Sequence, residues 1–94
     1  MKEAVTDEIL SASLDRMKEA TFDSHAVIRD LMTYHPQEYV TDLASQVASK
    51  DPILTYHAGL GSRLANWPSI ERTTKVMSVN VRGQVTENQG WKKK

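Results

Sequence analysis

Hydrophobic residues recur at three- and four-residue steps in four stretches of the chain, which is the spacing of one face of an α-helix. The first stretch covers residues 6–20, with Thr6 placed to cap the helix. Its apolar stripe consists of Ile9, Leu10, Leu14 and Met17. Because the stripe is narrow, we expect this helix to lie at the rim of the domain or against a second copy of the chain.

Two further helices follow with a connection of only a few residues. Asp23 is predicted to cap the second helix, and Pro36 suits the first position of the third. The expected buried face of the second helix is Val27, Ile28, Leu31 and Met32. The corresponding face of the third helix is Tyr39, Val40, Leu43 and Val47.

The fourth helix has the most distinct beginning, with Asp51 as its N-cap and Pro52 at its first position. One stripe of this helix combines Ile53, His57, Leu60, Leu64 and Trp67. The opposite face then presents Thr55, Ala58, Ser62 and Asn66, with Arg63 on its flank. We expect His57 to be a hydrogen-bonded histidine of the core or of an interface.

From Thr74 the period changes to two, which is typical of a β-strand. Arg82 and Gly83 are suited to a turn, and residues 84–91 are predicted to return as a second strand. We expect the side of this hairpin that carries Met77, Val79 and Val81 to lie on the helices, with Trp91 as an anchor. The sequence therefore predicts a mostly helical α+β fold of about four helices followed by a C-terminal β-hairpin.

This order of elements resembles the winged helix-turn-helix domain. The resemblance is carried by three helical segments at residues 24–32, 39–47 and 53–66, and by the hairpin at residues 76–91. In that family the third of these helices lies in the DNA major groove and a basic wing residue contacts the backbone or the minor groove. The resemblance implies those roles for residues 53–66 and for Arg82. The domain organisation expected from it is an N-terminal helix at 1–21 serving as a possible dimerisation arm, a winged-helix-like domain at 22–91 and a basic tail at 92–94.

The net charge of zero hides an asymmetry along the chain. Up to Ser49 there are four Lys or Arg against nine Asp or Glu, and after it eight against three. Cations gathered on one face would attract a polyanion, so double-stranded DNA is the first partner to consider. The candidate nucleic-acid-binding residues are Lys50, Thr55, Ser62, Arg63, Asn66, Arg72, Lys75 and Arg82. The alternative is a protein-interaction module of the same fold that uses the small-residue helix face or the acidic first helix.

Catalytic and metal-binding chemistry find little support in the sequence. The adjacent residues Asp23, Ser24 and His25 point about 100° apart at a helix start, so they cannot form a catalytic triad among themselves. The three histidines lack metal-site spacing, and there is no cysteine. No apolar run has the length of a signal peptide or a membrane span. We therefore predict a small cytoplasmic, non-enzymatic regulator of transcription without cofactor, metal or membrane contact, which dimerises through its first helix.

Overall fold

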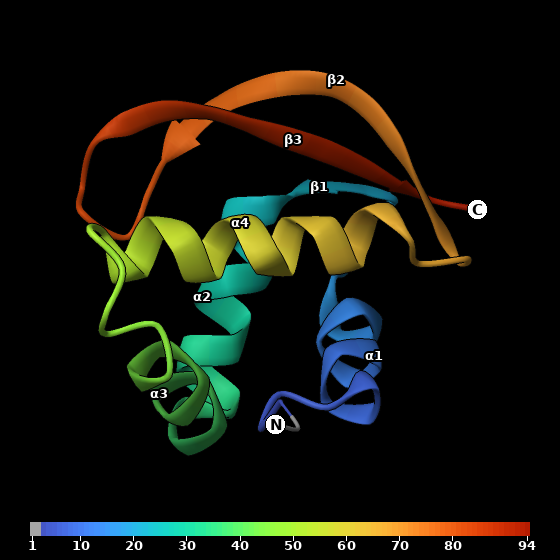
Figure 1. Cartoon of the computed structure of the whole chain (residues 1–94). Helices are drawn as coiled ribbons and strands as arrows, with labels where there is room; N and C mark the ends of the chain where they lie inside the picture. The colour runs from blue at the N-terminus through green and yellow to red at the C-terminus, as the bar shows by residue number, and fades with distance from the viewer. Residues whose placement is uncertain (1–2) are drawn as a thin grey trace.

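The computed structural model describes residues 3–94, and within them four helices and three strands form one α+β fold (Figure 1). The elements in chain order are α1 (Asp7–Arg16), β1 (Thr21–Asp23), α2 (Ser24–Tyr34), α3 (Pro36–Ala44), α4 (Pro52–Ala65), β2 (Ile70–Val79) and β3 (Val85–Lys93). The predicted fold class, helices followed by a C-terminal hairpin, is confirmed.

The predicted helix starts are also confirmed. Thr6, Asp23 and Asp51 each accept a hydrogen bond from the backbone N–H three residues further on, at 3.3, 2.9 and 3.2 Å. Pro36 and Pro52 occupy the first turns of α3 and α4, where a missing N–H costs nothing. These signals are local in sequence, so they fix the helix boundaries without help from the rest of the fold.

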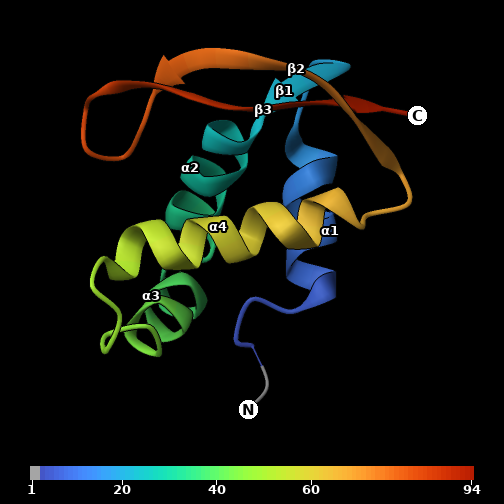
Figure 2. The same cartoon turned by 45° about the horizontal axis from the view of Figure 1, so that its top comes forward.

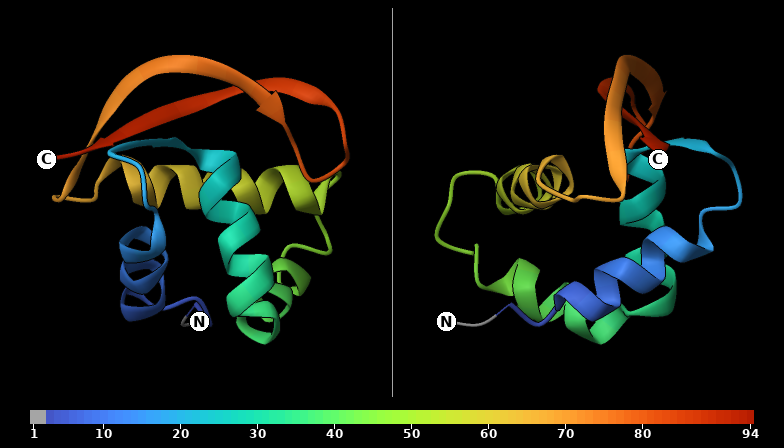
Figure 3. Two further views of the ribbon diagram at one scale, coloured as in Figure 1. Left: turned by 180° about the vertical axis from the view of Figure 1, so that it is seen from behind. Right: turned by 90° about the vertical axis from the view of Figure 1, so that its right-hand side faces the viewer.

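The three strands form an antiparallel sheet in the order β1-β3-β2. The hairpin of β2 and β3 crosses above α4, while α1 and α3 lie on the opposite side of α4 (Figures 1 and 3). Figure 2 shows the same sheet above the N-terminal end of α2. Strand β1 was not predicted, because three residues are too few to display a two-residue period.

Helix α1 belongs to the same hydrophobic core as the rest of the chain. Leu10 is fully buried and Leu14 is 4% exposed, in one cluster with residues of α2, α4 and β3. Arg16 at the end of α1 also makes three hydrogen bonds to the buried Asp30 of α2, at 2.6 to 3.1 Å. The helix expected over residues 1–21 spans only Asp7–Arg16, and the stripe expected to face a second copy is covered within the chain. The division into an arm at 1–21 and a domain at 22–91 stays a prediction.

The N-terminal segment is fastened by Asp42, a buried carboxylate of α3. Asp42 accepts hydrogen bonds from the backbone N–H groups of Ala4 and Val5, at 2.6 and 2.9 Å. It also accepts one from the hydroxyl of Tyr56 on α4, at 3.1 Å. One side chain thus joins the start of the chain to two helices.

Along β2 the hairpin packs with the opposite face to the one predicted, although Val81, beyond the end of β2, packs against the core as expected. Met77 and Val79 are exposed, whereas Val76 and Ser78 are half-buried on the side of the helices. The physical reason is that this part of the hairpin lies over the polar first turn of α2, where Ser78 pairs with His25 at 2.6 Å. Polar side chains on the inner face form hydrogen bonds with that turn, whereas aliphatic side chains would leave its polar groups without partners.

Three residues expected in the core of the helices are exposed instead: Met32, Val40 and Val47. The case of Val47 follows from the length of α3, which ends at Ala44 and continues as a series of turns. A helical stripe cannot extend beyond the helix that carries it. Trp91, by contrast, is 2% exposed, which confirms its prediction as the anchor of the hairpin.

Candidate nucleic-acid interface

The face of α4 predicted to point outward is exposed along the length of the helix. Thr55, Ala58, Ser62 and Asn66 all lie on the surface. The side chains of Ser62 and Asn66 donate to carbonyl oxygens of α4 itself, at 3.2 and 3.0 Å. With 14 residues the helix is about 21 Å long. It therefore presents a long, narrow and uncharged surface of mostly small side chains, with the exposed Leu54 beside Ala58 in its first turn.

The opposite side of α4 is tied to α3 through aromatic and histidine side chains. The hydroxyl of Tyr39 lies 2.6 Å from Nε2 of His57, and the rings of Tyr39 and Tyr56 contact each other at a centroid distance of 5.5 Å with a tilt of 58°. Burial lowers the pKa of His57, which keeps its ring neutral, and burial raises the pKa of Tyr39. His57 is thus a hydrogen-bonded histidine of the core boundary, as its position on the apolar stripe predicted.

The N-terminal end of α4 meets the tip of the hairpin. Nη2 of Arg82 lies 2.6 Å from Oδ1 of Asp51, and the hydrogen bond from Arg82 lowers the pKa of that carboxyl. Gly83 adopts a φ of 80°, in the left-handed region that glycine tolerates, and closes the turn. Lys50, next to Asp51, is exposed. Arg82 therefore lies at the N-terminal end of α4 and is already paired with a carboxylate.

The C-terminal end of α4 directs its arginine elsewhere. Nη1 of Arg63 donates to the carbonyl oxygen of Val5 at 2.7 Å, and Nη2 pairs with Asp7 at 3.0 Å. The side chain is only 19% exposed and turns toward α1, away from the outward face. Twelve residues of helix separate Arg63 from the Asp51 position, or about 18 Å. Arg63 and Arg82 therefore lie at opposite ends of α4 and do not form one cationic patch.

The remaining candidate cations lie on β2 and beside the hairpin. Arg72 and Lys75 are exposed on either side of an irregularity in the β2–β3 pairing. Within residues 3–94, neither they nor Lys50 has a carboxylate at ion-pair distance. Arg29 on α2 was not predicted, and its Nη1 donates to the carbonyl oxygen of Val79 at 3.1 Å. No local pattern in the sequence indicates this contact of Arg29, because Val79 is 50 residues away.

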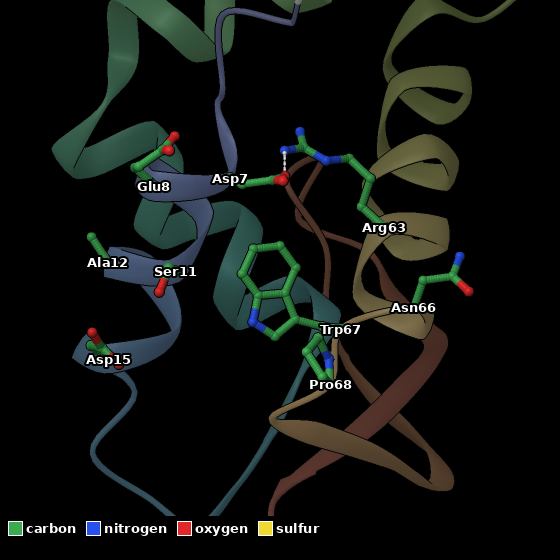
Figure 4. A pocket seen from close by; sticks show the side chains of 9 residues that line it. All are labelled: Asp7, Glu8, Ser11, Ala12, Asp15, Arg63, Asn66, Trp67 and Pro68. Atoms are coloured by element: carbon green, nitrogen blue, oxygen red, sulfur yellow. Dashed lines mark hydrogen bonds and ion pairs between the residues drawn. The ribbon is translucent and has the colours of Figure 1, made fainter.

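A cleft of about 820 Å³ runs between α1 and the C-terminal end of α4 (Figure 4). The indole of Trp67 and the paired side chains of Asp7 and Arg63 lie in its middle. Its lining residues are Asp7, Glu8, Ser11, Ala12, Asp15, Arg63, Asn66, Trp67 and Pro68. Three carboxylates against one guanidinium make this cleft negative, so a phosphate backbone would be repelled here. Any polyanion on α4 would then contact its N-terminal end.

A polar network at the start of α2 joins His25 to the hairpin. Besides the bond to Ser78, the backbone N–H of His25 donates to Asn88 at 3.0 Å, and Asn88 donates to Ser78 at 3.2 Å. Burial lowers the pKa of His25. Burial acts to raise the pKa of Asp23, yet hydrogen bonds from the backbone of Ala26 and from Ser78 and Asn88 leave it lowered. Because Asp23 caps α2 instead of orienting the histidine ring, the arrangement binds the hairpin to α2 and has no nucleophile–base–acid order.

Metal coordination and membrane insertion both depend on how the side chains of residues 3–94 are placed. No group of three His, Cys, Asp or Glu side chains in this part of the chain is placed to hold a metal ion. None of its helices combines the length and the apolar character that crossing a membrane requires. Comparison of the chain with protein families, with curated proteins and with solved structures finds no match. The resemblance to a winged helix is therefore limited to the order of the helices and strands.

Proposed function

We propose that this protein binds double-stranded DNA without catalysing a reaction, through the outward face of α4 and the tip of the hairpin. The observation that carries the proposal is the open face of α4, uncharged over its length and flanked by cations at the end where the hairpin tip lies. The major groove of B-DNA is about 12 Å wide and admits an α-helix. Small residues such as Ala58 and Gly59 on that face allow the helix backbone to approach the bases closely.

Phosphate contacts would come from cations that surround this helix end. Lys50 and Arg82 lie beside the start of α4, and Arg29 reaches the hairpin from α2. Such contacts give affinity without reading sequence. On α4 itself Thr55 and Ser62 are the side chains able to hydrogen-bond a base edge, because Asn66 lies in the negative cleft at the other end of the helix, so we expect modest sequence preference. Transcription regulation and a cytoplasmic location belong to the same proposal, and a homodimer would need a surface other than Leu10 and Leu14.

Binding to a random-sequence duplex, measured by fluorescence anisotropy over a range of salt concentrations, tests this proposal. Neutralising about three phosphates predicts a slope of log K against log salt near −3. The double variant with Thr55→Glu and Ser62→Glu places two carboxylates on the α4 face, and we expect it to lose affinity by about tenfold or more. The double variant with Gln37→Glu and Thr41→Glu, at exposed positions of α3, is the matched control and should change affinity little. Absence of binding at low salt would refute the proposal.

A second candidate function, docking of another protein, is favoured by the outer face of the hairpin. Met77, Val79 and Val85 are 63%, 50% and 62% exposed. Val79 pairs directly with Val85, and Met77 lies two residues along the same face, so the three side chains are neighbours. A cluster of exposed aliphatic residues on an edge strand is typical of an interaction surface. Sedimentation of the wild type and of the double variant with Met77→Ser and Val79→Ser tests it, since association that the variant loses would support this candidate.

A further inference from the structure

Arg82, one of the cations proposed to contact the duplex, is already paired with a carboxylate of the same chain. Oδ1 of Asp51 accepts from Nη2 of Arg82 at 2.6 Å and from the backbone N–H of Leu54 at 3.2 Å. A single oxygen therefore serves both as the cap of α4 and as the partner of the hairpin tip. The side chain of Arg82 is nevertheless 48% exposed, so an anion from solvent can reach it.

The conformation of the hairpin tip directs Arg82 onto α4. Oδ1 of Asn80 accepts hydrogen bonds from the backbone N–H groups of Arg82 and Gln84, at 2.9 and 3.1 Å. Together with the left-handed Gly83, these bonds fix the path of the turn. The ion pair then connects residues 31 positions apart, and it is the one salt bridge in the described part of the chain between the hairpin tip and a helix.

We propose that Asp51 is an internal competitor for Arg82, so that its carboxylate holds the hairpin-tip guanidinium until a phosphate of the duplex displaces it. This inference rests on the proposed function and adds a regulatory contact to the same site. Arginine pairs with carboxylate and with phosphate in the same geometry, so the two anions compete for one set of donors. An exposed ion pair stabilises weakly, so the contact lowers affinity without preventing binding.

The test is the substitution Asp51→Asn, which removes the charge and keeps a side chain that caps a helix as well as aspartate does. We expect this variant to bind a random-sequence duplex about two- to fivefold more tightly than the wild type at low salt. Its log–log salt slope should equal that of the wild type, because Arg82 contacts a phosphate in both complexes and the number of neutralised phosphates does not change. Adding Arg82→Ala to Asp51→Asn should abolish the gain, because the freed guanidinium is its source.

The matched control is Glu87→Gln, which makes the same change in net charge on the hairpin. Glu87 is exposed on β3, and no ion pair to it occurs among residues 3–94. We expect it to change affinity less than Asp51→Asn does, by an amount that Arg82→Ala leaves unaltered. Thermal unfolding followed by circular dichroism checks that every variant is folded.

The outcomes separate this inference from the proposed function. If wild type and Asp51→Asn bind the duplex equally, or if the variant binds more weakly, the competitor role is refuted while DNA binding stands. If neither protein binds at low salt, the proposed function fails and the inference fails with it.

Discussion

The two halves of the β2–β3 hairpin are held in different ways. At its base, Ile70 and Trp91 are buried in the core, and β3 is paired on both sides, with β1 and β2. Toward its tip, the outer side chains are exposed, and the hydrogen bonds and ion pairs to the helices are made by Ser78, the carbonyl of Val79 and Arg82. The base is part of the hydrophobic core, whereas the tip is attached by polar contacts and by the half-buried Val81.

This difference separates stability from binding within one element. Burying a tryptophan contributes several kcal/mol, whereas a hydrogen bond such as that between His25 and Ser78 contributes about 1 kcal/mol net. Changes at the tip therefore alter the surface with little effect on folding. The proposed DNA contacts therefore lie in the half of the hairpin where substitutions change the stability of the fold least.

Trp91→Ala should have the largest effect, because it removes the anchor of the base. We expect the free energy of unfolding to fall by about 3–5 kcal/mol, from the cavity and from the lost hydrogen bond to Ser24. Urea unfolding followed by circular dichroism measures it. Met77→Ala, near the tip, is the control and should cost less than about 0.5 kcal/mol. Equal losses at the two positions would erase the distinction between base and tip.

Gly90→Ala should destabilise the base by a different mechanism. A Cβ atom at Gly90 would lie 2.7 Å from the carbonyl oxygen of Thr74, where β2 bends over β3. Backbone has to move to relieve that contact, so we expect a loss of about 1–3 kcal/mol in the same unfolding experiment. At Gly59 in α4 an added Cβ meets nothing within 4 Å. Gly59→Ala should therefore stabilise by up to about 1 kcal/mol, and a loss there would contradict this account.

Ser78→Ala tests the polar attachment of the tip and should have a smaller effect. It removes a hydrogen-bond partner of both His25 and Asn88, for which we expect a loss of about 1 kcal/mol. Ser62→Ala, whose hydroxyl bonds only to its own helix, is the control and should be nearly neutral. Amide exchange measured by NMR should show faster opening at the tip of the hairpin than at its base. A uniform change along both strands would indicate that the halves are not independent.

Acid should lower the stability of the fold through His25, which contacts the hairpin, and through His57 on α4. Burial lowers the pKa of His25 and His57 below their ordinary value of 6.5. As the pH falls below about 6.5, the unfolded chain takes up protons that the folded chain does not, so stability decreases. The midpoint of thermal unfolding should fall between pH 7.5 and 5.5, and less so in His25→Asn. A midpoint that rises on acidification would show the sign to be wrong.

The features that sequence predicted are those set by neighbouring residues. The caps Thr6, Asp23 and Asp51 and the turn at Gly83 depend on local backbone geometry, and each lies where expected. The exposed face of α4 likewise follows from the helical period. These parts of the fold and of the candidate site needed no knowledge of distant residues.

The features that sequence missed depend on residues far apart in the chain. Which face of the hairpin turns inward was decided by the polar start of α2, and no period within the strand records that. Arg63 is one of the residues predicted to contact DNA. Its guanidinium is paired with Asp7, and no local pattern indicates this pair because the two residues are 56 positions apart. The cations expected on one face are apart for the same reason. Arg63 pairs with Asp7 at one end of α4, and Arg82 pairs with Asp51 at the other end.

Asp42 ties the beginning of the chain to the cooperative unfolding of the whole molecule. If residues 4 and 5 detached, the carboxylate would lose two of its three hydrogen bonds while Val5 left the core. Fraying of this end is therefore penalised as strongly as opening of an internal helix. We expect the amide protons of Ala4 and Val5 to exchange with deuterium as slowly as those in the middle of α4, which is unusual protection for residues so near an end of the polypeptide.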